Sequence, residues 1–356
     1  MKRIPVILFG VGGVGSVLLE QIMESREVVA ARNRLRFDVV ALADSGSWRW
    51  DPAGLDEVKL EKVLAARRKG ERVGEGERPD GVGILRQIAA VGVEGAIVVD
   101  ATAAAGMAPV LEEALALAYG VVLANKKPLT GPWAQAKRFY GQPRLRYEAT
   151  VGAGQPVIAT LRYLLDTADP IFQIEGQLSG TLGYICRRLD EGDRFSVALA
   201  AAKARGYTEP DPREDLGGRD VMRKLLILAR TAGWPLEEEE VAVESLFPSA
   251  LAHLDVQEFM LASLALDPPF RERVNAAGAA GEVLRYVATV EASRGSVGLK
   301  PVPMESPLAN MKYIGFRTGR YDDDPLLIAG KGAGVDITAA GVLGDMIALG
   351  REVVGD

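Results

Sequence analysis

The sequence predicts an α/β protein in which a first domain is joined to a second domain of α+β class. Over residues 1–150, short apolar runs alternate with amphipathic stretches, which is typical of a parallel sheet with right-handed helical crossovers. Beyond residue 150 helical stretches dominate. From Glu282 onward, short alternating runs predict antiparallel strands. A chain of 356 residues is long enough to bury two separate cores.

The first apolar run covers residues 4–9. A turn of glycines and valines, residues 10–15, follows it, and a helical stretch over 16–23 comes next. Glycine permits a tight turn and a close approach of backbone to a pyrophosphate, while the following helix start offers free N–H groups. Strand, glycine turn and helix together predict a Rossmann-type dinucleotide-binding domain over residues 1–150. Its first cofactor contacts are expected at Gly10, Val11, Gly12, Gly13, Val14 and Gly15.

The alternation then continues along the first domain. We expect strands over 37–43, 96–99, 121–124 and 146–150, helices over 55–66, 107–119 and 133–140, and a loop over 67–83. Ligands bind at the carboxyl ends of parallel strands. The polar residues expected at those ends are Asp44, Asp100, Thr102, Asn125 and Lys126. The Asp44 carboxylate suits a ribose 2′-hydroxyl and opposes a 2′-phosphate. Arg49 would offset that repulsion, so the choice between NAD and NADP stays open.

The second domain is expected to carry helices over 156–168, 182–189 and 196–205 and a strand over 172–178. An acidic loop from Gly206 precedes an amphipathic helix over 221–232. Pro210 and Pro212 stiffen this loop, which a merely solvated segment would not need. We expect domains over 1–150 and 151–315, with residues 316–356 returning to the first domain.

Asp220 and Lys224 stand at the end of the acidic loop and have two readings. Asp220 suits a helix N-cap, and an Asp and a Lys four residues apart form an ordinary surface pair. Against this, Lys224 precedes the apolar residues 225–228, so it is expected to be partly buried. A lysine held among carboxylates can protonate or stabilise a developing alkoxide. The pair is therefore also a candidate catalytic group.

Composition excludes several classes of function. The net charge of −6 argues against general nucleic-acid binding, which needs a basic face. One histidine and one cysteine, Cys186, cannot supply a zinc site of nitrogen and sulfur ligands. No apolar run reaches the roughly 20 residues of a membrane span. We expect a soluble cytoplasmic protein without nucleic-acid or membrane partners, in which Cys186 is packed in the core.

Seven segments of the chain, spread over nearly its whole length, form a recognisable set of motifs: 10–15, 125–127, 148–154, 179–182, 206–212, 220–224 and 332–345. In sequence and order these segments resemble the motifs of the homoserine dehydrogenase family. The middle motifs are long and follow the family's order, which makes them more specific than the glycine turn.

The resemblance implies reversible reduction of L-aspartate 4-semialdehyde to L-homoserine with NADP or NAD, in threonine and methionine biosynthesis. It places the catalytic lysines at Lys224 and Lys126, and further cofactor contacts at Thr102 and Gly334. It implies a homodimer formed through the sheet of the second domain. The substrate-binding residues it implies are Glu209, Asp215, Asp220, Gly180, Thr181 and Tyr207. The implied monovalent-cation (sodium) site falls on Glu148, Val151, Ala153 and Gln155.

The chain resembles a short, monofunctional form, without the aspartokinase and ACT modules of longer members, so threonine feedback through such a module is not expected. Two alternatives remain. Another amino-acid or semialdehyde dehydrogenase would share the cofactor domain, and an acylating one would need the Cys186 thiol. A non-catalytic dinucleotide-sensing protein would bind the cofactor without turnover.

Overall fold

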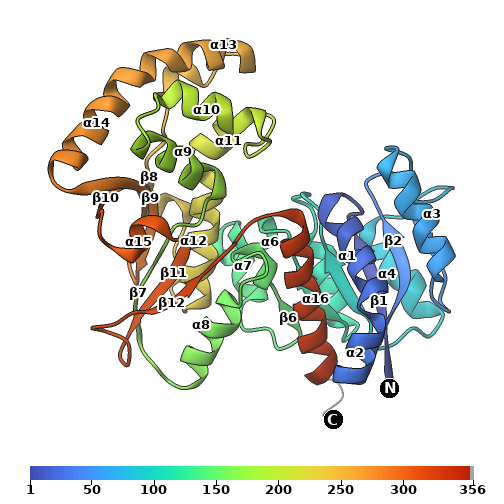
Figure 1. Cartoon of the computed structure of the whole chain (residues 1–356). Helices are drawn as coiled ribbons and strands as arrows, with labels where there is room; N and C mark the ends of the chain where they lie inside the picture. Colours follow the sequence, from blue (N-terminus) through green and yellow to red (C-terminus); the bar gives the residue numbers. More distant parts are fainter. Residues whose placement is uncertain (353–356) are drawn as a thin grey trace. The chain divides into compact units, whose positions relative to one another are not determined.

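The computed structural model describes residues 1–352 and divides into two compact units. Unit 1 comprises Met1–Ile158 and Ala333–Asp356, and unit 2 comprises Ala159–Gly332. Unit 2 is therefore an insertion between two segments of unit 1 (Figure 1). Within residues 1–352, no helix combines the length and the apolar character that crossing a bilayer requires.

Unit 1 contains one six-stranded sheet with helices packed on it. Its strands are β1 (Lys2–Phe9), β2 (Leu35–Ala43), β3 (Trp48–Trp50), β4 (Ile97–Asp100), β5 (Gly120–Leu123) and β6 (Leu145–Arg146). Its helices are α1 (Gly13–Glu24), α2 (Arg26–Asn33), α3 (Glu57–Arg68), α4 (Gly81–Ala90), α5 (Ala108–Ala116), α6 (Lys127–Thr130), α7 (Trp133–Ala136) and α16 (Val335–Glu352), with 3-10 turns η1 (Lys137–Phe139) and η2 (Glu148–Thr150).

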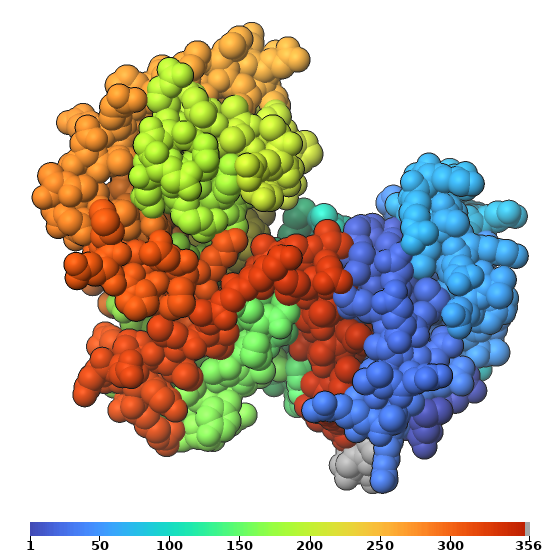
Figure 2. Space-filling view, in the orientation of Figure 1, coloured from blue at the N-terminus to red at the C-terminus, as the bar shows by residue number. Residues whose placement is uncertain are grey.

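The sheet of unit 1 has the strand order β3-β2-β1-β4-β5-β6, and all neighbours are parallel except the edge strand β3. One face of β1, carrying Ile4, Val6 and Leu8, is buried in a core with residues of α1, α3 and α16. Helix α16 lies directly against the N-terminal segment (Figure 2). Parallel neighbours and buried, mostly apolar strands confirm the predicted Rossmann-type sheet.

Three local predictions for unit 1 were incomplete or wrong. The predicted strand over 146–150 ends at Arg146, because Glu148–Thr150 form a 3-10 turn whose first N–H donates to the Asp345 carboxylate (2.8 Å). Helix α4 begins at the end of the predicted loop, where Asp80 accepts a hydrogen bond from the Gly83 N–H (2.6 Å). The short antiparallel strand β3 was not predicted.

Unit 2 contains a second six-stranded sheet with helices on it. Its strands are β7 (Ile171–Gly176), β8 (Val241–Val243), β9 (Glu282–Glu291), β10 (Arg294–Pro303), β11 (Tyr313–Thr318) and β12 (Leu326–Ala329). Its helices are α9 (Gly180–Asp190), α10 (Phe195–Ala204), α11 (Arg213–Leu216), α12 (Arg219–Thr231), α13 (Val256–Ala262), α14 (Asp267–Ala279) and α15 (Pro307–Asn310), with 3-10 turns η3 (Glu238–Glu240), η4 (Ser249–Leu251) and η5 (Ser263–Leu266). Helix α8 (Val157–Asp166) begins in unit 1 and continues into unit 2.

The second sheet has the order β12-β11-β7-β9-β10-β8, and its strands pair antiparallel except β8 with β10. Helices α9, α12 and α14 contact its central strand β9. The predicted antiparallel strands beyond Glu282 are therefore confirmed, and the chain has the predicted α/β plus α+β composition.

Candidate functional site

The glycine turn of unit 1 lies between β1 and α1 and has no room for side chains at two of its positions. Gly10 has a φ of +93°, and a Cβ there would lie 2.7 Å from the carbonyl carbon of Ala101. A Cβ on Gly15 would lie 1.9 Å from the Gly10 carbonyl oxygen. Gly12 is different, because no atom lies within 4 Å of its Cβ position. Since α1 has no side-chain cap, its first N–H groups face this open space and suit an anion such as a pyrophosphate.

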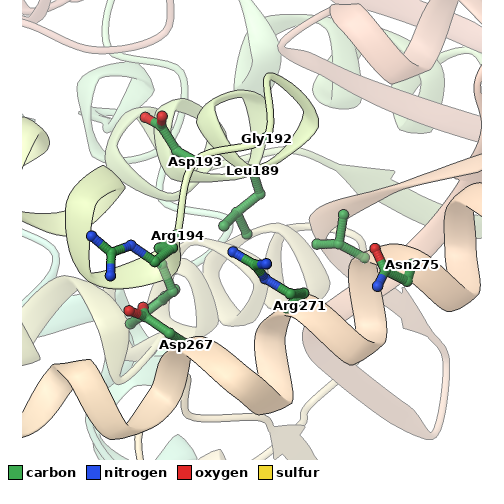
Figure 3. Close-up of a pocket in the computed structure, with 9 residues that line it drawn as sticks. Leu189, Gly192, Asp193, Arg194, Asp267, Arg271 and Asn275 are labelled. Carbon is green, nitrogen blue, oxygen red and sulfur yellow. The ribbon is translucent and has the colours of Figure 1, made fainter.

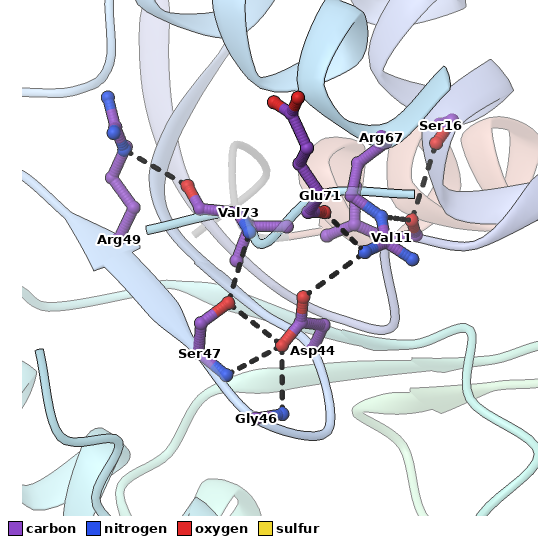
Figure 4. Close-up of polar contacts among 9 residues, drawn as sticks. All are labelled: Val11, Ser16, Asp44, Gly46, Ser47, Arg49, Arg67, Glu71 and Val73. Carbon is purple, nitrogen blue, oxygen red and sulfur yellow. Dashed lines mark hydrogen bonds and ion pairs between the residues drawn. The ribbon is translucent and has the colours of Figure 1, made fainter. Parts of the chain in front are cut away.

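Asp44, at the end of β2, holds its own loop in place and pairs with Arg67 (Figure 4). Its Oδ1 accepts hydrogen bonds from the N–H groups of Gly46 (2.9 Å) and Ser47 (2.6 Å) and from the Ser47 hydroxyl (2.9 Å). Its Oδ2 lies 3.4 Å from Nη1 of Arg67. Burial opposes ionisation, but these hydrogen bonds and the nearby guanidinium outweigh it and lower the pKa of Asp44 from its ordinary value.

Arg67, near the end of α3, connects Asp44 to the glycine turn. Its Nε donates to the carbonyl oxygen of Val11 (2.9 Å), and its Nη1 donates to that of Glu71 (2.8 Å). The sequence had suggested Arg49 as the cation that offsets the Asp44 charge. In the structure Arg49 instead donates from Nε to the carbonyl oxygen of Val73 (3.1 Å), and Arg67 is the residue beside Asp44.

The ends of β4 and β5 bring three of the polar residues together. Asp100 is fully buried and accepts hydrogen bonds from the Thr102 N–H (2.9 Å), the Thr102 hydroxyl (2.7 Å) and the Asn125 amide (2.9 Å). Burial raises the pKa of Asp100 despite these bonds. Lys126 follows Asn125 in the chain and immediately precedes the short helix α6, so Thr102 and Lys126 both lie at this edge of the sheet. The Asp100 carboxylate therefore positions the neighbouring backbone.

In unit 2 the acidic loop folds back on the start of α9. The Thr181 hydroxyl donates to the carbonyl oxygen of Tyr207, and the Glu209 N–H donates to Oδ2 of Asp215 (2.8 Å). Burial raises the pKa of Asp215, and the charges of Asp220 and Glu214 add to the shift. Gly180 is the first residue of α9, capped by the Ser179 hydroxyl. The structure thus brings together most of the residues expected to bind the substrate.

Lys224 lies on α12 with 12% of its side chain exposed, so the predicted partial burial is confirmed. Its Nζ donates to the carbonyl oxygen of Leu178 (2.8 Å) and pairs with Oδ2 of Asp220 (2.8 Å). The prediction that Asp220 caps this helix was wrong. The N-cap is Gly218, with a φ of +70°, and Asp220 lies in the first turn.

The segment expected to hold a cation forms the turn between η2 and α8. The Glu148 carboxylate accepts a hydrogen bond from the Ile158 N–H (2.6 Å) at the start of α8. Ala153 has a φ of +56°, and its carbonyl oxygen lies so close to α16 that a Cβ on Gly341 would be 1.9 Å away. Residues 1–352 contain no group of three or more His, Cys, Asp or Glu side chains placed to hold a metal ion. Any cation here would need backbone carbonyl ligands.

Two further features of unit 2 lie apart from these residues. A pocket of about 250 Å³ between α9, α10 and α14 is lined by residues including Arg194, Asp267 and Arg271, none of which was predicted to bind substrate (Figure 3). Cys186 is buried, and burial raises the pKa of its thiol to about 11. A thiol so rarely ionised is a poor nucleophile, which disfavours an acyl-enzyme mechanism.

The sequence reasoning missed two charged residues beside the predicted ones. Arg67 falls in a charged stretch that reads as solvated, and only the fold brings it to Val11 and Asp44. Lys312 precedes β11, and no local pattern marks it, although its charge interacts with that of Lys224.

Comparison with known proteins identifies the relatives of this chain. A family model described as homoserine dehydrogenase matches residues 156–347, which is more than half of the sequence. The chain is 36% identical over 355 residues to the chloroplastic bifunctional aspartokinase/homoserine dehydrogenase 1 of Arabidopsis thaliana, covering 96% of this chain and 38% of that protein. The chain therefore spans well under half the length of this relative.

Solved structures show the same architecture. A putative homoserine dehydrogenase from Archaeoglobus fulgidus superposes with a TM-score of 0.77 at 26% identity, covering 97% of this chain and 99% of the other. A hyperthermophilic archaeal homoserine dehydrogenase in complex with NADPH has the same fold, with a TM-score of 0.72 at 21% identity, covering 99% and 98%. Together with the glycine turn of unit 1 and the lysine and carboxylates of unit 2, these matches show that the chain belongs to the homoserine dehydrogenase family.

Proposed function

We propose that this protein catalyses the reversible, NAD(P)H-dependent reduction of L-aspartate 4-semialdehyde to L-homoserine. The observation that carries the proposal is Lys224, a mostly buried amine paired with Asp220 beside a loop of ordered carboxylates. A lysine has three donor hydrogens. Two are engaged by Leu178 and Asp220, which leaves one for a substrate oxygen.

The roles follow from the chemistry of the substrate, which carries an ammonium, a carboxylate and an aldehyde. Glu209, Asp215 and Asp220 would bind the ammonium group, while Gly180, Thr181 and Tyr207 would line the pocket. Lys224 would donate a proton to the aldehyde oxygen during reduction and take it back during oxidation, with Lys126 as the second lysine. When bound, the nicotinamide supplies or accepts the hydride.

The glycine turn fits the dinucleotide, because Gly12 leaves open space in front of the uncapped start of α1. Gly10, Val11, Gly12, Gly13, Val14 and Gly15 would hold the pyrophosphate, with Asp44, Thr102, Lys126 and Gly334 as further contacts. A structure of the same fold was solved with NADPH. We infer that Arg67 decides how well the protein accepts NADP relative to NAD, because its guanidinium neutralises the Asp44 carboxylate.

Arg67→Ala is expected to lower kcat/KM for NADP more than kcat/KM for NAD. Without the guanidinium, the Asp44 carboxylate repels a 2′-phosphate, and we expect the NADP-to-NAD ratio to fall by roughly 10-fold or more. Arg49→Ala is the matched control, since Arg49 contacts the Val73 carbonyl instead of Asp44. An equal loss with both cofactors would show that Arg67 only maintains the turn.

Asp215 makes substrate binding dependent on pH. Its carboxyl group binds an ammonium only when ionised, and burial raises its pKa. The KM for homoserine should therefore rise as the pH falls through this raised pKa, at higher pH than for an ordinary aspartate. The raised pKa of Asp215 also affects the stability of the fold, and there the dependence on pH is the opposite. A raised folded-state pKa gives stability that is present at low pH and lost as the pH rises. Asp215→Asn should remove this rise of the KM at acid pH. If the rise remained in the variant, another titrating group would be responsible for it.

We propose that sodium binds at the turn formed by Glu148, Val151, Ala153 and Gln155. Within residues 1–352, the carbonyl oxygens of Val151 and Ala153 accept no hydrogen bond, so they are available as ligands for a hard cation. Raising sodium at constant ionic strength, with choline as the replacement cation, should increase homoserine oxidation to a plateau. A rate that does not change with sodium would remove the cation from the proposal.

We also propose a cytoplasmic homodimer, formed through the sheet of unit 2, that acts in threonine and methionine biosynthesis. Sedimentation of the purified protein would test the dimer. A monomer at micromolar concentration would contradict it.

The proposed function is tested by following the absorbance of the reduced nicotinamide during homoserine oxidation, in parallel with NAD and NADP. Cofactor binding without a homoserine-dependent signal would instead favour a non-catalytic dinucleotide-sensing protein. Cys186→Ser tests the remaining alternative. An acylating semialdehyde dehydrogenase would lose activity with this substitution, whereas the enzyme proposed here should retain it.

A further inference from the structure

Beside Lys224, unit 2 contains a group of positive charges that the roles above do not use. Lys312 lies immediately before β11, and its charge interacts with those of Arg187, Lys224 and Lys331. The antiparallel register pairs Ile314 with Gly176. Continued by two residues, this register places Lys312 opposite Leu178, whose carbonyl oxygen accepts the hydrogen bond from Lys224.

Lys312 and Arg187 reach the same place above α9. A Cβ on Gly183 would lie 3.9 Å from Cε of Lys312 and 3.9 Å from Nη1 of Arg187. Tyr184, one helical turn before Arg187 on α9, packs edge-on against Tyr207, with 5.0 Å between the ring centroids. The two cations therefore lie next to the residues proposed to line the substrate pocket.

This cationic pair has no anionic partner within the protein. Across residues 1–352, neither Lys312 nor Arg187 forms an ion pair or a side-chain hydrogen bond. Lys312 is half-buried. Burial and the charges of Arg187, Lys224 and Lys331 all lower the pKa of Lys312, and no carboxylate offsets them. Like charges held together in a partly buried place are unfavourable, and an anion placed between them would relieve the repulsion.

The substrate proposed above has an anionic group without an assigned partner. Three carboxylates are available for its ammonium group and a lysine for its reacting oxygen, but none of these suits its carboxylate. We propose that Lys312, together with Arg187, binds the carboxylate of the amino-acid substrate and so selects amino acids over simple amino alcohols. This proposal rests on the proposed function and assigns a specificity-determining residue to the same site.

The proposal is tested with Lys312→Met, which keeps the apolar stem and removes the charge. Loss of a charge-assisted hydrogen bond should raise the KM for L-homoserine by roughly 10- to 100-fold. The value of kcat and the KM for the cofactor should change little, because neither the proton donor nor the dinucleotide site is altered. Lys300→Met is the matched control, since Lys300 is also a half-buried lysine of unit 2 but donates to the Thr289 hydroxyl.

A second substrate makes the test specific for the carboxylate. The amino alcohol 3-aminopropan-1-ol is homoserine without its carboxylate. The wild-type protein should prefer homoserine strongly, and Lys312→Met should reduce that preference by the same factor as its rise in KM, while the weak activity on the amino alcohol stays unchanged. Lys312→Arg should restore part of the preference.

The outcomes separate the two proposals. No homoserine oxidation by the wild-type protein would overturn the proposed function itself. An active wild type whose KM and preference are unchanged in Lys312→Met, or whose two substrates lose activity equally, would overturn only the role of Lys312. If Lys312→Met does not fold, Arg187→Gln replaces it, because Arg187 is exposed. Arg187→Gln should also raise the KM for homoserine, and an unchanged KM would count against the proposal.

Discussion

Replacing Lys224 with alanine is expected to lower kcat for homoserine oxidation by about 10²- to 10⁴-fold, the usual contribution of a positioned proton donor. The side chain is mostly buried, and its Nζ is held between the Leu178 carbonyl oxygen and the Asp220 carboxylate. Solvent water is therefore poorly placed to replace Lys224 as the proton donor. Cofactor affinity should be nearly unchanged, because the pyrophosphate is expected at the glycine turn before α1, whereas Lys224 is a residue of α12. Steady-state kinetics together with a fluorescence titration of the reduced cofactor would measure both quantities.

The control for this variant is Arg223→Ala, which removes a cation from the neighbouring position of α12 without touching Leu178. It should retain activity. Lys224→Ala should lower the stability only modestly, because Asp220 is half exposed and remains solvated, while the Leu178 carbonyl oxygen loses a hydrogen bond that contributes about 1 kcal/mol. Loss of cofactor binding alongside activity would instead show that Lys224 has a structural role.

Gly12→Ala is expected to abolish tight cofactor binding while leaving the fold intact. No atom lies within 4 Å of the Cβ position of Gly12, so the methyl group has space in the protein itself. That space is where the pyrophosphate would approach the backbone. Overpacking by a methyl group typically costs about 1–3 kcal/mol, which corresponds to roughly 10- to 100-fold in the dissociation constant of the cofactor. Calorimetric titration with NADP and NAD measures this directly.

Substitutions at two other glycines serve as controls for this prediction. Gly278→Ala, on α14, also adds a methyl group to open space and should change neither stability nor cofactor binding. Gly15→Ala should destabilise the fold itself, because its Cβ would lie 1.9 Å from the Gly10 carbonyl oxygen. If Gly12→Ala bound the cofactor as tightly as the wild type, the dinucleotide would have to bind elsewhere.

The sequence predicted the features whose cause is local. The run over 4–9, the glycine turn and the helix after it are specified by neighbouring residues, and the structure has β1 and α1 there. The amphipathic run after the acidic loop also forms α12, and the apolar residues after Lys224 account for its partial burial. Hydrophobic periodicity and turn-forming residues are short-range signals, so a single sequence is enough to detect them.

The features that the sequence did not predict depend on distant partners. The strand expected to reach Thr150 stops early because Glu148 donates to Asp345, which is 197 residues further along the chain. Asp220 does not cap α12, because Gly218 occupies that position with a left-handed backbone packed on the Tyr286 hydroxyl. Arg67 and Lys312 become relevant only when the fold brings them to Asp44 and Lys224. No local pattern encodes such approaches.

The position of α16 also bears on biosynthesis. Its residues Ala339, Val342 and Met346 complete the hydrophobic core that begins with Ile4 and Val6. A ribosome therefore releases the first segment of unit 1 with an open apolar flank, and that flank is closed only after the whole of unit 2 has emerged. The inserted unit has all of its strands available earlier and can mature first. Nascent chains halted before residue 335 should consequently recruit chaperones at the exposed flank.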